Sequence, residues 1–590
     1  MSRVPIADRL RLTWQLPRRM LHHVVARLVS HPLLRPPLPG RKPDRLVIAP
    51  QDLRTADPTR ASEIYAGRFA FAGKIVICDG RSPFEMVPPS DEWEENLLGF
   101  GWLRHLRAAE SSITRANARA LVDEWISLQG GYDRAAWRAD VLARRVVAWL
   151  SQAPLILEGA NARFYRRFLR NLTRQIRYLR YTAPSARDGI GRIQAHIALT
   201  YAALCLQSQF RYLNAASRRL VEELQSQVLP DGGHVSRNPG ALIELLLDLL
   251  PLNQAFTARN VAPPPALINA IDRMMPMLRF FRHGDGNFAL FNGMGLTPPD
   301  QLATILAYDD ARGTPIANAA YSGYQRIEAG DGVLIADTGK PPPLEMSGEA
   351  HAGCLSFEYS VRHQRLVVNC GLPATSRENW RQLSRATAAH STVTFHETSS
   401  CQFIDSGIFK RLYGTLMASG PTSVPIERQE RDIGLVLRAS HNGYVERFGL
   451  VHQRTLLLHP NGMRLDGEDI FLPAGGQALP ANARDDFALR FHLHPSVRAN
   501  RLNDGRGVML TTPSKDLWTF NSPEDEVDIE ESVYLASPEG PRRTVQIVIR
   551  GRARQIQRIL WTFNFVQQQQ LAGPSSARNK GRGKDPELPL

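Results

Sequence analysis

The sequence predicts an α+β protein of two large domains, an N-terminal α/α toroid followed by a C-terminal antiparallel β-sandwich. Two changes of pattern predict this order. From about residue 93 to residue 324, apolar residues recur at the spacing of helices, and turns separate the segments. Beyond residue 324, short runs alternate apolar and polar residues between Gly, Asn, Asp and Pro, which is typical of antiparallel strands.

The helical half consists of consecutive amphipathic segments. In the segment 141–150, apolar residues are three and four positions apart, and Pro154 follows its end. Further helices are expected at 164–179, 193–206, 215–228, 241–250 and 265–281. Consecutive helices of this kind, joined by turns, fit an α/α toroid.

The second half contains many short alternating runs with turn residues between them. Strands are expected at 332–337, 355–359, 365–368, 391–395, 435–439, 454–458, 487–494, 507–511, 517–520 and 544–549. Their spacing and the Gly, Asn, Asp and Pro turns between them predict an antiparallel β-sandwich.

Four parts of the chain follow from these patterns. Residues 1–75 are expected to form an Arg- and Pro-rich helix and an extended lead-in, 76–325 the toroid, 326–566 the sandwich, and 567–590 a disordered tail. The first helix would pack on the body or rest on anionic lipid, and it lacks the apolar core of a signal peptide. The compartment, periplasm or cytoplasm, therefore stays open, as does the oligomeric state.

Composition narrows the classes of partner. The chain has 590 residues with 43% hydrophobic content, enough for two cores, and no apolar run long enough to predict a transmembrane segment. A net charge of +15 favours polyanions, although an Arg bias can also reflect the base composition of a genome. No nucleic-acid motif is present, so an acidic polysaccharide or oligosaccharide is the expected partner and nucleic acid is not. Five scattered cysteines predict no disulfide framework.

Three motifs carry a family resemblance. They are His351-Ala-Gly-Cys-Leu-Ser-Phe-Glu-Tyr359, Val367-Val-Asn-Cys-Gly371 and Arg385-Ala-Thr-Ala-Ala-His-Ser-Thr-Val393. In this order and spacing they resemble the C-terminal domain of the heparinase II/III family of polysaccharide lyases. The resemblance implies a toroid and a sandwich with a glycan groove between them, and cleavage of a uronate-containing glycan by β-elimination.

The resemblance also bears on metal binding. His351 and His390 match two positions that bind a structural zinc, with an aspartate, in some members of the family. That aspartate corresponds here to Asn369, and the motif's other aspartate to Gly353. A neutral amide is a poor zinc ligand, so we expect no metal and no cofactor.

β-Elimination at a uronate needs a base, an acid for the leaving oxygen, and a clamp that neutralises the carboxylate. The catalytic candidates are His351, His390, His234 and Tyr308. The candidates for substrate binding are Arg237, Asn238, Asn292, Arg385 and Glu349. Each of them also has a structural interpretation, such as a strand-edge histidine, a helix-capping loop or a solvent-facing acid.

The helical half departs from the family's catalytic pattern. The family's tyrosine falls at Ala241 and its following histidine at Leu242, and its Asn-His pair falls near Ile190-Gly191. We therefore expect a lyase-like enzyme that acts on an acidic glycan, with a non-catalytic glycan-binding protein on the same scaffold as the alternative. A third interpretation, an α/α glycoside hydrolase, would need carboxylates that face each other across the groove, and Asp309-Asp310 is the nearest candidate pair.

Overall fold

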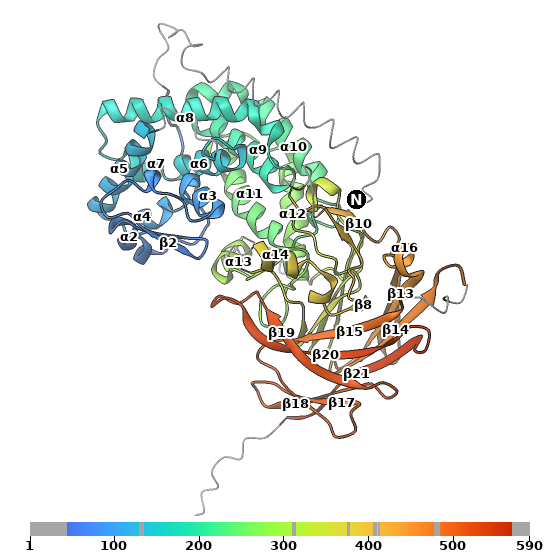
Figure 1. Ribbon diagram of the computed structural model, residues 1–590. Coiled ribbons are helices and arrows are strands. Elements are labelled where there is room, and N and C mark those ends of the chain that lie inside the picture. Colours follow the sequence, from blue (N-terminus) through green and yellow to red (C-terminus); the bar gives the residue numbers. More distant parts are fainter. Residues whose placement is uncertain are drawn as a thin grey trace, which may run out of the picture.

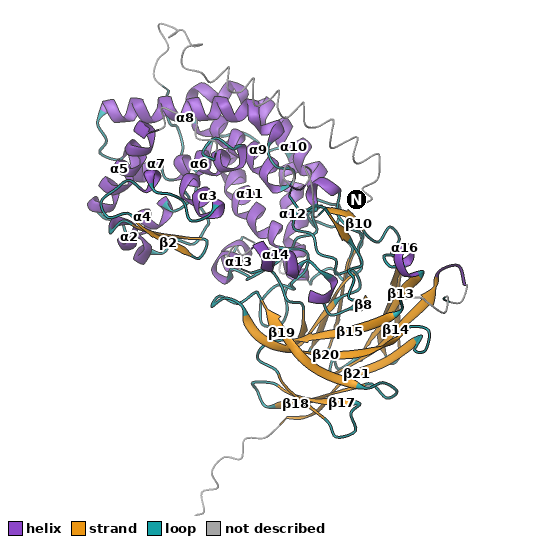
Figure 2. Cartoon of the chain, in the orientation of Figure 1, coloured by secondary structure: helices purple, strands orange, loops and turns teal. Residues whose placement is uncertain are grey.

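The computed structural model describes residues 44–128, 135–308, 314–373, 378–404, 410, 414–476, 479 and 484–568. Helices form one lobe and antiparallel sheets form the other, and the two are joined in chain order (Figures 1 and 2). The predicted N-terminal helix lies outside the described residues, as does Asp309-Asp310. The tail predicted for 567–590 also lies outside them, except that residues 567 and 568 end a strand.

The helical lobe is an α/α toroid. Its helices are α2 (Pro58–Tyr65), α3 (Asp91–Gly99), α4 (Leu103–Ala108), α5 (Ser112–Leu128), α6 (Ala139–Ser151), α7 (Ala153–Leu157), α8 (Ala162–Thr182), α9 (Ile190–Cys205), α10 (Leu213–Gln227), α11 (Gly240–Ala258), α12 (Pro265–Phe280) and α13 (Pro299–Leu306). A hairpin of β1 (Arg68–Phe71) and β2 (Lys74–Ile77) lies beside α2 and α3. The expected lead-in is therefore not extended up to residue 75, because its apolar residues Ala61, Ile64 and Phe69 are buried against the first helices.

Local sequence explains where these helices begin and run. The hydroxyl of Ser90 accepts a hydrogen bond from the Trp93 amide and caps α3. Three acidic residues occupy the first turn of α3, where their negative charge interacts favourably with the positive end of the helix dipole. Helix α11 continues through Pro251 beyond the predicted end at 250. It is the one described helix long and apolar enough to cross a bilayer, but its residues are largely buried within the toroid core.

Two antiparallel sheets form the sandwich. The first, in spatial order, contains β11 (Ile426–Arg431), β12 (Gly434–His441), β13 (Leu450–Leu458), β14 (Arg464–Pro473), β21 (Arg558–Gln568), β18 (Asp516–Asn521), β17 (Gly507–Thr511) and β16 (Arg498–Arg501). The second contains β19 (Val527–Tyr534), β20 (Arg542–Arg552), β15 (Asp486–Leu493), β7 (Gln364–Val368), β6 (Phe357–Val361), β5 (Gly332–Asp337), β4 (Tyr324–Ala329) and β3 (Asn318–Ala319), and β8 (Val393–Phe395) pairs with β15.

Alternation along the strands explains the core between the sheets. In β13, buried and partly buried residues alternate over all nine positions, as expected for a strand with one face toward the core. Aromatic rings from both sheets meet there, with Phe357 stacked on Trp561 at 5.6 Å and Phe491 4.7 Å from Trp561 between ring centroids. The predicted toroid and sandwich are both confirmed.

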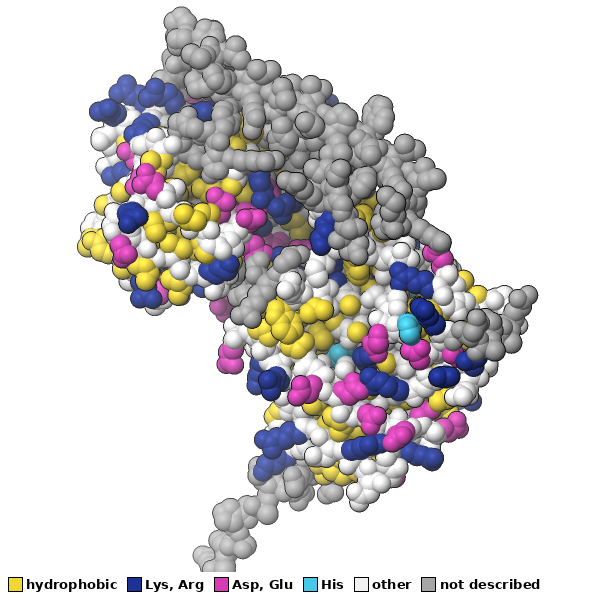
Figure 3. Space-filling view, in the orientation of Figure 1, with side chains coloured by type: hydrophobic (Ala, Val, Ile, Leu, Met, Phe, Trp, Pro, Cys, Tyr) yellow, Lys and Arg dark blue, Asp and Glu magenta, His cyan; other side chains and the backbone are white. Residues whose placement is uncertain are grey.

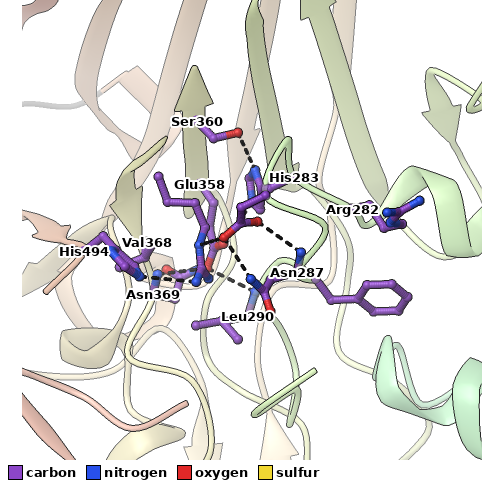
Figure 4. A network of polar contacts seen from close by, with 12 residues as sticks. Arg282, His283, Asn287, Leu290, Glu358, Ser360, Val368, Asn369 and His494 are labelled. Carbon is purple, nitrogen blue, oxygen red and sulfur yellow. Dashed lines mark hydrogen bonds and ion pairs between the residues drawn. The ribbon is translucent and has the colours of Figure 1, made fainter. Parts of the chain in front are cut away.

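Buried polar contacts join the lobes where α12 ends. His283, just beyond α12, donates from Nε2 to Oε2 of Glu358 on β6 at 3.1 Å, and both side chains are fully buried. The other carboxylate oxygen accepts from the backbone amides of Leu290 and Asn369 at 3.0 and 2.9 Å (Figure 4). A Cβ on Gly284 would lie 1.7 Å from the carbonyl oxygen of Arg362, so the two backbones meet closely only because this residue is glycine.

Candidate functional site

A cavity of about 1320 Å³ lies between the lobes. The toroid contributes residues of α3, α6, α9 and α11, and the β1–β2 hairpin lines one end. From the C-terminal half come the loop 345–349, helix α14 (Glu378–Ser384) and residues 414–416. Figure 3 shows acidic and basic side chains in the recess between the two lobes.

The cavity carries charges of both signs. Its acidic residues are Asp52, Glu92, Glu95, Asp140, Asp188, Glu244, Asp248, Glu345 and Glu349. Its basic residues are Arg54, Arg60, Lys74, Arg104, Arg144, Arg187 and Arg381. Acidic residues outnumber Lys and Arg among the lining residues, so the net charge of +15 is not concentrated in the cavity.

Arg381 of α14 links the two walls of the cavity. Its Nη1 contacts Oε1 of Glu92 on α3 at 2.6 Å, and its Nη2 contacts Oε1 of Glu349 at 3.3 Å. Glu349 also accepts from Nδ2 of Asn238, in the loop before α11, at 3.1 Å. Glu349 and Asn238, both predicted as binding residues, are therefore in contact, and Glu349 lines the cavity together with Arg381, which was not among the predicted site residues.

His234 lines the same cavity, in the loop that precedes α11. Its Nδ1 lies 2.7 Å from Oγ of Ser236 and its Nε2 lies 3.0 Å from Oε1 of Gln227, so both ring nitrogens have protein partners. Burial lowers the pKa of His234 to about 4, which keeps the imidazole neutral at pH 7. A neutral imidazole can accept a proton, but here its lone pair already faces a hydrogen-bonding neighbour.

Arg237 differs from its predicted role as a carboxylate clamp. Its guanidinium is buried, contacts Oδ1 of Asp337 at 2.5 Å, and donates to the carbonyl oxygens of Ser322, Gly323 and Lys340. The backbone of Arg237 adopts a left-handed φ of 64°, which a tightly fixed loop can hold. Arg237 joins the toroid loop to the sandwich and does not line the cavity.

His351 and His390 are brought together, as their motifs suggested. Nδ1 of His351 lies 3.0 Å from Nε2 of His390, and Nδ1 of His390 lies 2.8 Å from the carbonyl oxygen of Ala386. A carbonyl only accepts, so His390 carries its proton on Nδ1 and accepts the Nδ1 proton of His351. Nε2 of His351 then bears an unpartnered lone pair within the described part of the chain.

Both rings are buried, and neither is among the residues that line the cavity. Burial lowers the pKa of His351 and of His390, so both are neutral at pH 7. A Cβ on Gly353 would lie 2.7 Å from Cδ2 of His390, which explains why a glycine stands at this motif position. The two histidines therefore form a packed imidazole pair outside the cavity lining.

Arg385 and Asn292 bind the backbone of the segment that carries His351. Arg385 is buried and donates to the carbonyl oxygens of Ser347, Ala350 and Thr415, and so fixes the loop that carries His351. Oδ1 of Asn292 accepts from the amide of His351 at 3.0 Å, and its Nδ2 donates to Oδ2 of Asp337. Both side chains are engaged with the protein and lie outside the cavity lining.

No accessible phenol was found among the described cavity residues. Tyr308, the predicted catalytic tyrosine, lies after α13 and packs on the toroid core, and it does not line the cavity. Tyr201 does line the cavity, but its hydroxyl donates to the carbonyl oxygen of Asp248 at 2.8 Å, and burial raises its pKa well above 10. The described cavity therefore offers no phenol suited to protonate a leaving oxygen.

Buried neutral histidines predict loss of stability in acid. The pKa of His105 and of His234 is about 4, and that of His492 about 3, in each case chiefly because of burial. A histidine in the unfolded chain has a pKa near 6.5. Below about pH 6.5 the unfolded chain therefore binds protons at these histidines that the folded chain does not bind, which favours unfolding. Each such histidine lowers the free energy of unfolding by up to about 1.4 kcal/mol per pH unit, between pH 6.5 and its folded pKa.

We therefore expect the urea midpoint to be lower at pH 5 than at pH 7.5, and unchanged between pH 7.5 and 8.5. Equal midpoints at pH 5 and 7.5 would contradict the assignment of these rings as buried and neutral. Intrinsic fluorescence reports the transition, because Trp93 and Trp149 are fully buried.

Comparison with known proteins identifies the family. The family model "Heparinase II/III-like, C-terminal" matches residues 311–562. FtsZ-localized protein C of Caulobacter vibrioides (strain NA1000 / CB15N) is 32% identical over 523 residues, which cover 87% of this chain and 88% of that protein. The chain belongs to the heparinase II/III-like family.

Solved structures of the heparinase II/III-like family share the fold. Heparinase III superposes with a TM-score of 0.69 at 14% identity, covering 96% of this chain and 92% of the other. A mutant of the heparan sulfate lyase HepC from Pedobacter heparinus gives a TM-score of 0.62 at 15% identity, covering 90% and 87%. The chain thus has a polysaccharide-lyase scaffold.

Proposed function

We propose that this protein binds a glycan segment in the cavity between its lobes without cleaving it. The observation that carries the proposal is the make-up of the cavity wall: a lyase scaffold whose described lining offers no accessible phenol. The buried imidazole pair of His351 and His390 supports the same proposal, because neither ring lines the cavity and both are held by protein partners. A binding role needs only the shape and polar groups of the cavity.

Arg381 is the residue that we propose as the anchor for a sugar carboxylate. Its contact with Glu92 is short, at 2.6 Å, whereas its contact with Glu349 is 3.3 Å and the Glu349 side chain is half exposed. A ligand carboxylate can take the place of Glu349 on the guanidinium while Glu92 keeps Arg381 oriented. Glu349, released from Arg381, then offers its carboxylate oxygens as acceptors to sugar hydroxyls.

The name of a similar protein also supports the non-catalytic interpretation. FtsZ-localized protein C is named for where it is found, and the identity of 32% extends over most of both chains. We include in the proposal that this protein also localises with FtsZ.

A β-eliminating lyase is the second candidate, favoured by one observation: the neutral His234 is among the residues that line the cavity. In that case His234 would take the C5 proton, and the proton donor for the leaving oxygen would come from the ligand or from water. His351, His390 and Arg385 would then position the wall, as they do for binding.

Calorimetric titration with uronate and amino-sugar oligosaccharides tests the binding proposal. Arg381→Gln should weaken binding of a uronate-containing ligand by about 10- to 100-fold, since a charge-assisted hydrogen bond is worth roughly 1.5–3 kcal/mol. Arg501→Gln is the matched control, because Arg501 also lies between two carboxylates, Glu526 at 2.8 Å and Asp528 at 3.2 Å, but outside the cavity. Equal affinities for wild type and Arg381→Gln would contradict the assigned anchor.

A further inference from the structure

Helix α8 carries an unusual concentration of positive charge. Its 21 residues include no Asp or Glu. They include seven arginines: Arg163, Arg166, Arg167, Arg170, Arg174, Arg177 and Arg180. Figure 3 shows basic side chains gathered at the upper left, where Figure 1 places the N-terminal part of α8.

These arginines form a line along one side of the helix. Arg163, Arg166, Arg170, Arg174 and Arg177 follow at intervals of three and four residues, which places them on one face. The line from the first to the last spans about 21 Å at 1.5 Å per residue. The opposite face is buried in the toroid core through Phe164, Phe168, Leu172, Ile176 and Leu179.

The charge on this face is not neutralised by the described part of the chain. Arg167 pairs with Asp123 at 2.8 Å, but no described carboxylate lies within 4 Å of the other six arginines. Arg174 packs over Trp137 at 5.1 Å and Arg180 over Tyr212 at 3.6 Å from guanidinium carbon to ring centroid, which orients the groups without cancelling their charge. In the cavity, by contrast, the arginines have acidic partners: Arg54, Arg187 and Arg381 are each paired with a carboxylate.

Like charges at this spacing oppose helix formation, so stability alone does not explain the line of arginines. The buried apolar face holds the helix in place and lets the outer face accumulate charge. That places a rigid row of guanidinium groups on the surface, and guanidinium pairs bidentately with sulfate and carboxylate.

We propose that the outer face of α8 is a docking surface for an extended polyanionic glycan, bearing sulfate or carboxylate groups, at a place distinct from the cavity. The straight line of charge fits a linear polymer that runs along the helix. No α8 residue lines the cavity, so this surface acts independently of the proposed function. No large apolar side chain is exposed on α8 before Tyr181, so the row lacks the apolar residues with which interfacial helices enter a bilayer.

Biolayer interferometry with the full chain tests the proposal, using immobilised heparin as the sulfated probe and polygalacturonate as the carboxylated probe. In the test variant, Arg163, Arg166, Arg170 and Arg177 are each changed to Gln, which keeps helix propensity and removes four charges. The control variant carries Arg498→Gln, Arg542→Gln, Arg543→Gln and Arg552→Gln. These are exposed sandwich residues with the same summed charge.

The α8 variant should bind at least one of the two probes about 100-fold more weakly than wild type, with a shallower dependence on salt, whereas the control variant should change by less than about threefold. Circular dichroism verifies that both variants stay folded. An equal loss in both variants would assign binding to net charge alone and overturn the proposal. So would unchanged binding in the α8 variant, or binding of wild type to phosphatidylglycerol vesicles but to neither glycan.

Discussion

Replacing Glu358 with Ala is expected to destabilise the protein by about 3–5 kcal/mol, the loss that follows when one partner of a buried pair is removed. Four donors converge on this carboxylate: Nε2 of His283, the amides of Leu290 and Asn369, and Nδ2 of Asn369. All of these groups are buried, so no solvent replaces the lost acceptor. The urea midpoint measures the change.

The Glu358 site also joins the lobes, because His283 and Leu290 belong to the segment that leaves α12. We therefore expect the Ala variant to unfold in two steps, with the helical lobe and the sandwich separating. Glu427→Ala is the control, since Glu427 forms a half-exposed pair with Arg438 at 3.5 Å and should change stability by less than about 1 kcal/mol. A Glu358→Ala variant as stable as this control would contradict the assigned junction.

Replacing Arg454 with Ala should have an effect of similar size inside the sandwich, about 3–5 kcal/mol. Its guanidinium is buried and contacts Asp469 at 2.8 Å, and Nη1 donates to the carbonyl oxygens of Leu355 and Ser391 at 2.8 Å each. The Ala variant would leave the Asp469 charge buried with no arginine, and only His452 and the indole N–H of Trp561 would remain as its partners among the described residues. Thermal unfolding followed by circular dichroism measures the loss.

The same variant should loosen the imidazole pair, because Leu355 and Ser391 lie in the segments that carry His351 and His390. Hydrogen exchange at these segments should rise. Arg464→Ala provides the control on the same sheet, where Arg464 and Asp466 form a partly exposed pair at 2.8 Å. Comparable losses in Arg454→Ala and Arg464→Ala would show that the buried network is not what holds the motif segments.

Local patterns were sufficient to predict the helical half, the strand-rich half and their order, and the family resemblance supported the toroid. The strand expected at 332–337 is β5, and the helices expected at 193–206 and 265–281 are α9 and α12 within a few residues. Each of these elements has a strong periodicity of apolar residues and turn residues at its ends, and both signals can be read from neighbouring residues in the sequence. Helix α11 ran beyond its predicted end because burial of its apolar residues outweighs the cost of Pro251 within it.

The candidate site was only partly predictable, because its contacts join distant residues. The motifs of His351 and His390 indicated that the rings would be close, and the structure brings them to 3.0 Å. Burial was not visible from the sequence: Arg237 meets an aspartate 100 positions away, and this pairing draws it into the junction. Arg381 and Glu92 are 289 residues apart, so no spacing could have indicated that they bridge the cavity.

The central claim, that the cavity binds a glycan without β-elimination, is tested most directly by ultraviolet absorbance. Purified wild-type protein is incubated with the oligosaccharides that bind in calorimetry, and the absorbance of an unsaturated uronate product is followed, with His234→Ala as the companion variant. The account predicts no rise for a ligand that binds with measurable affinity. A rise that His234→Ala abolishes would contradict it and establish the lyase.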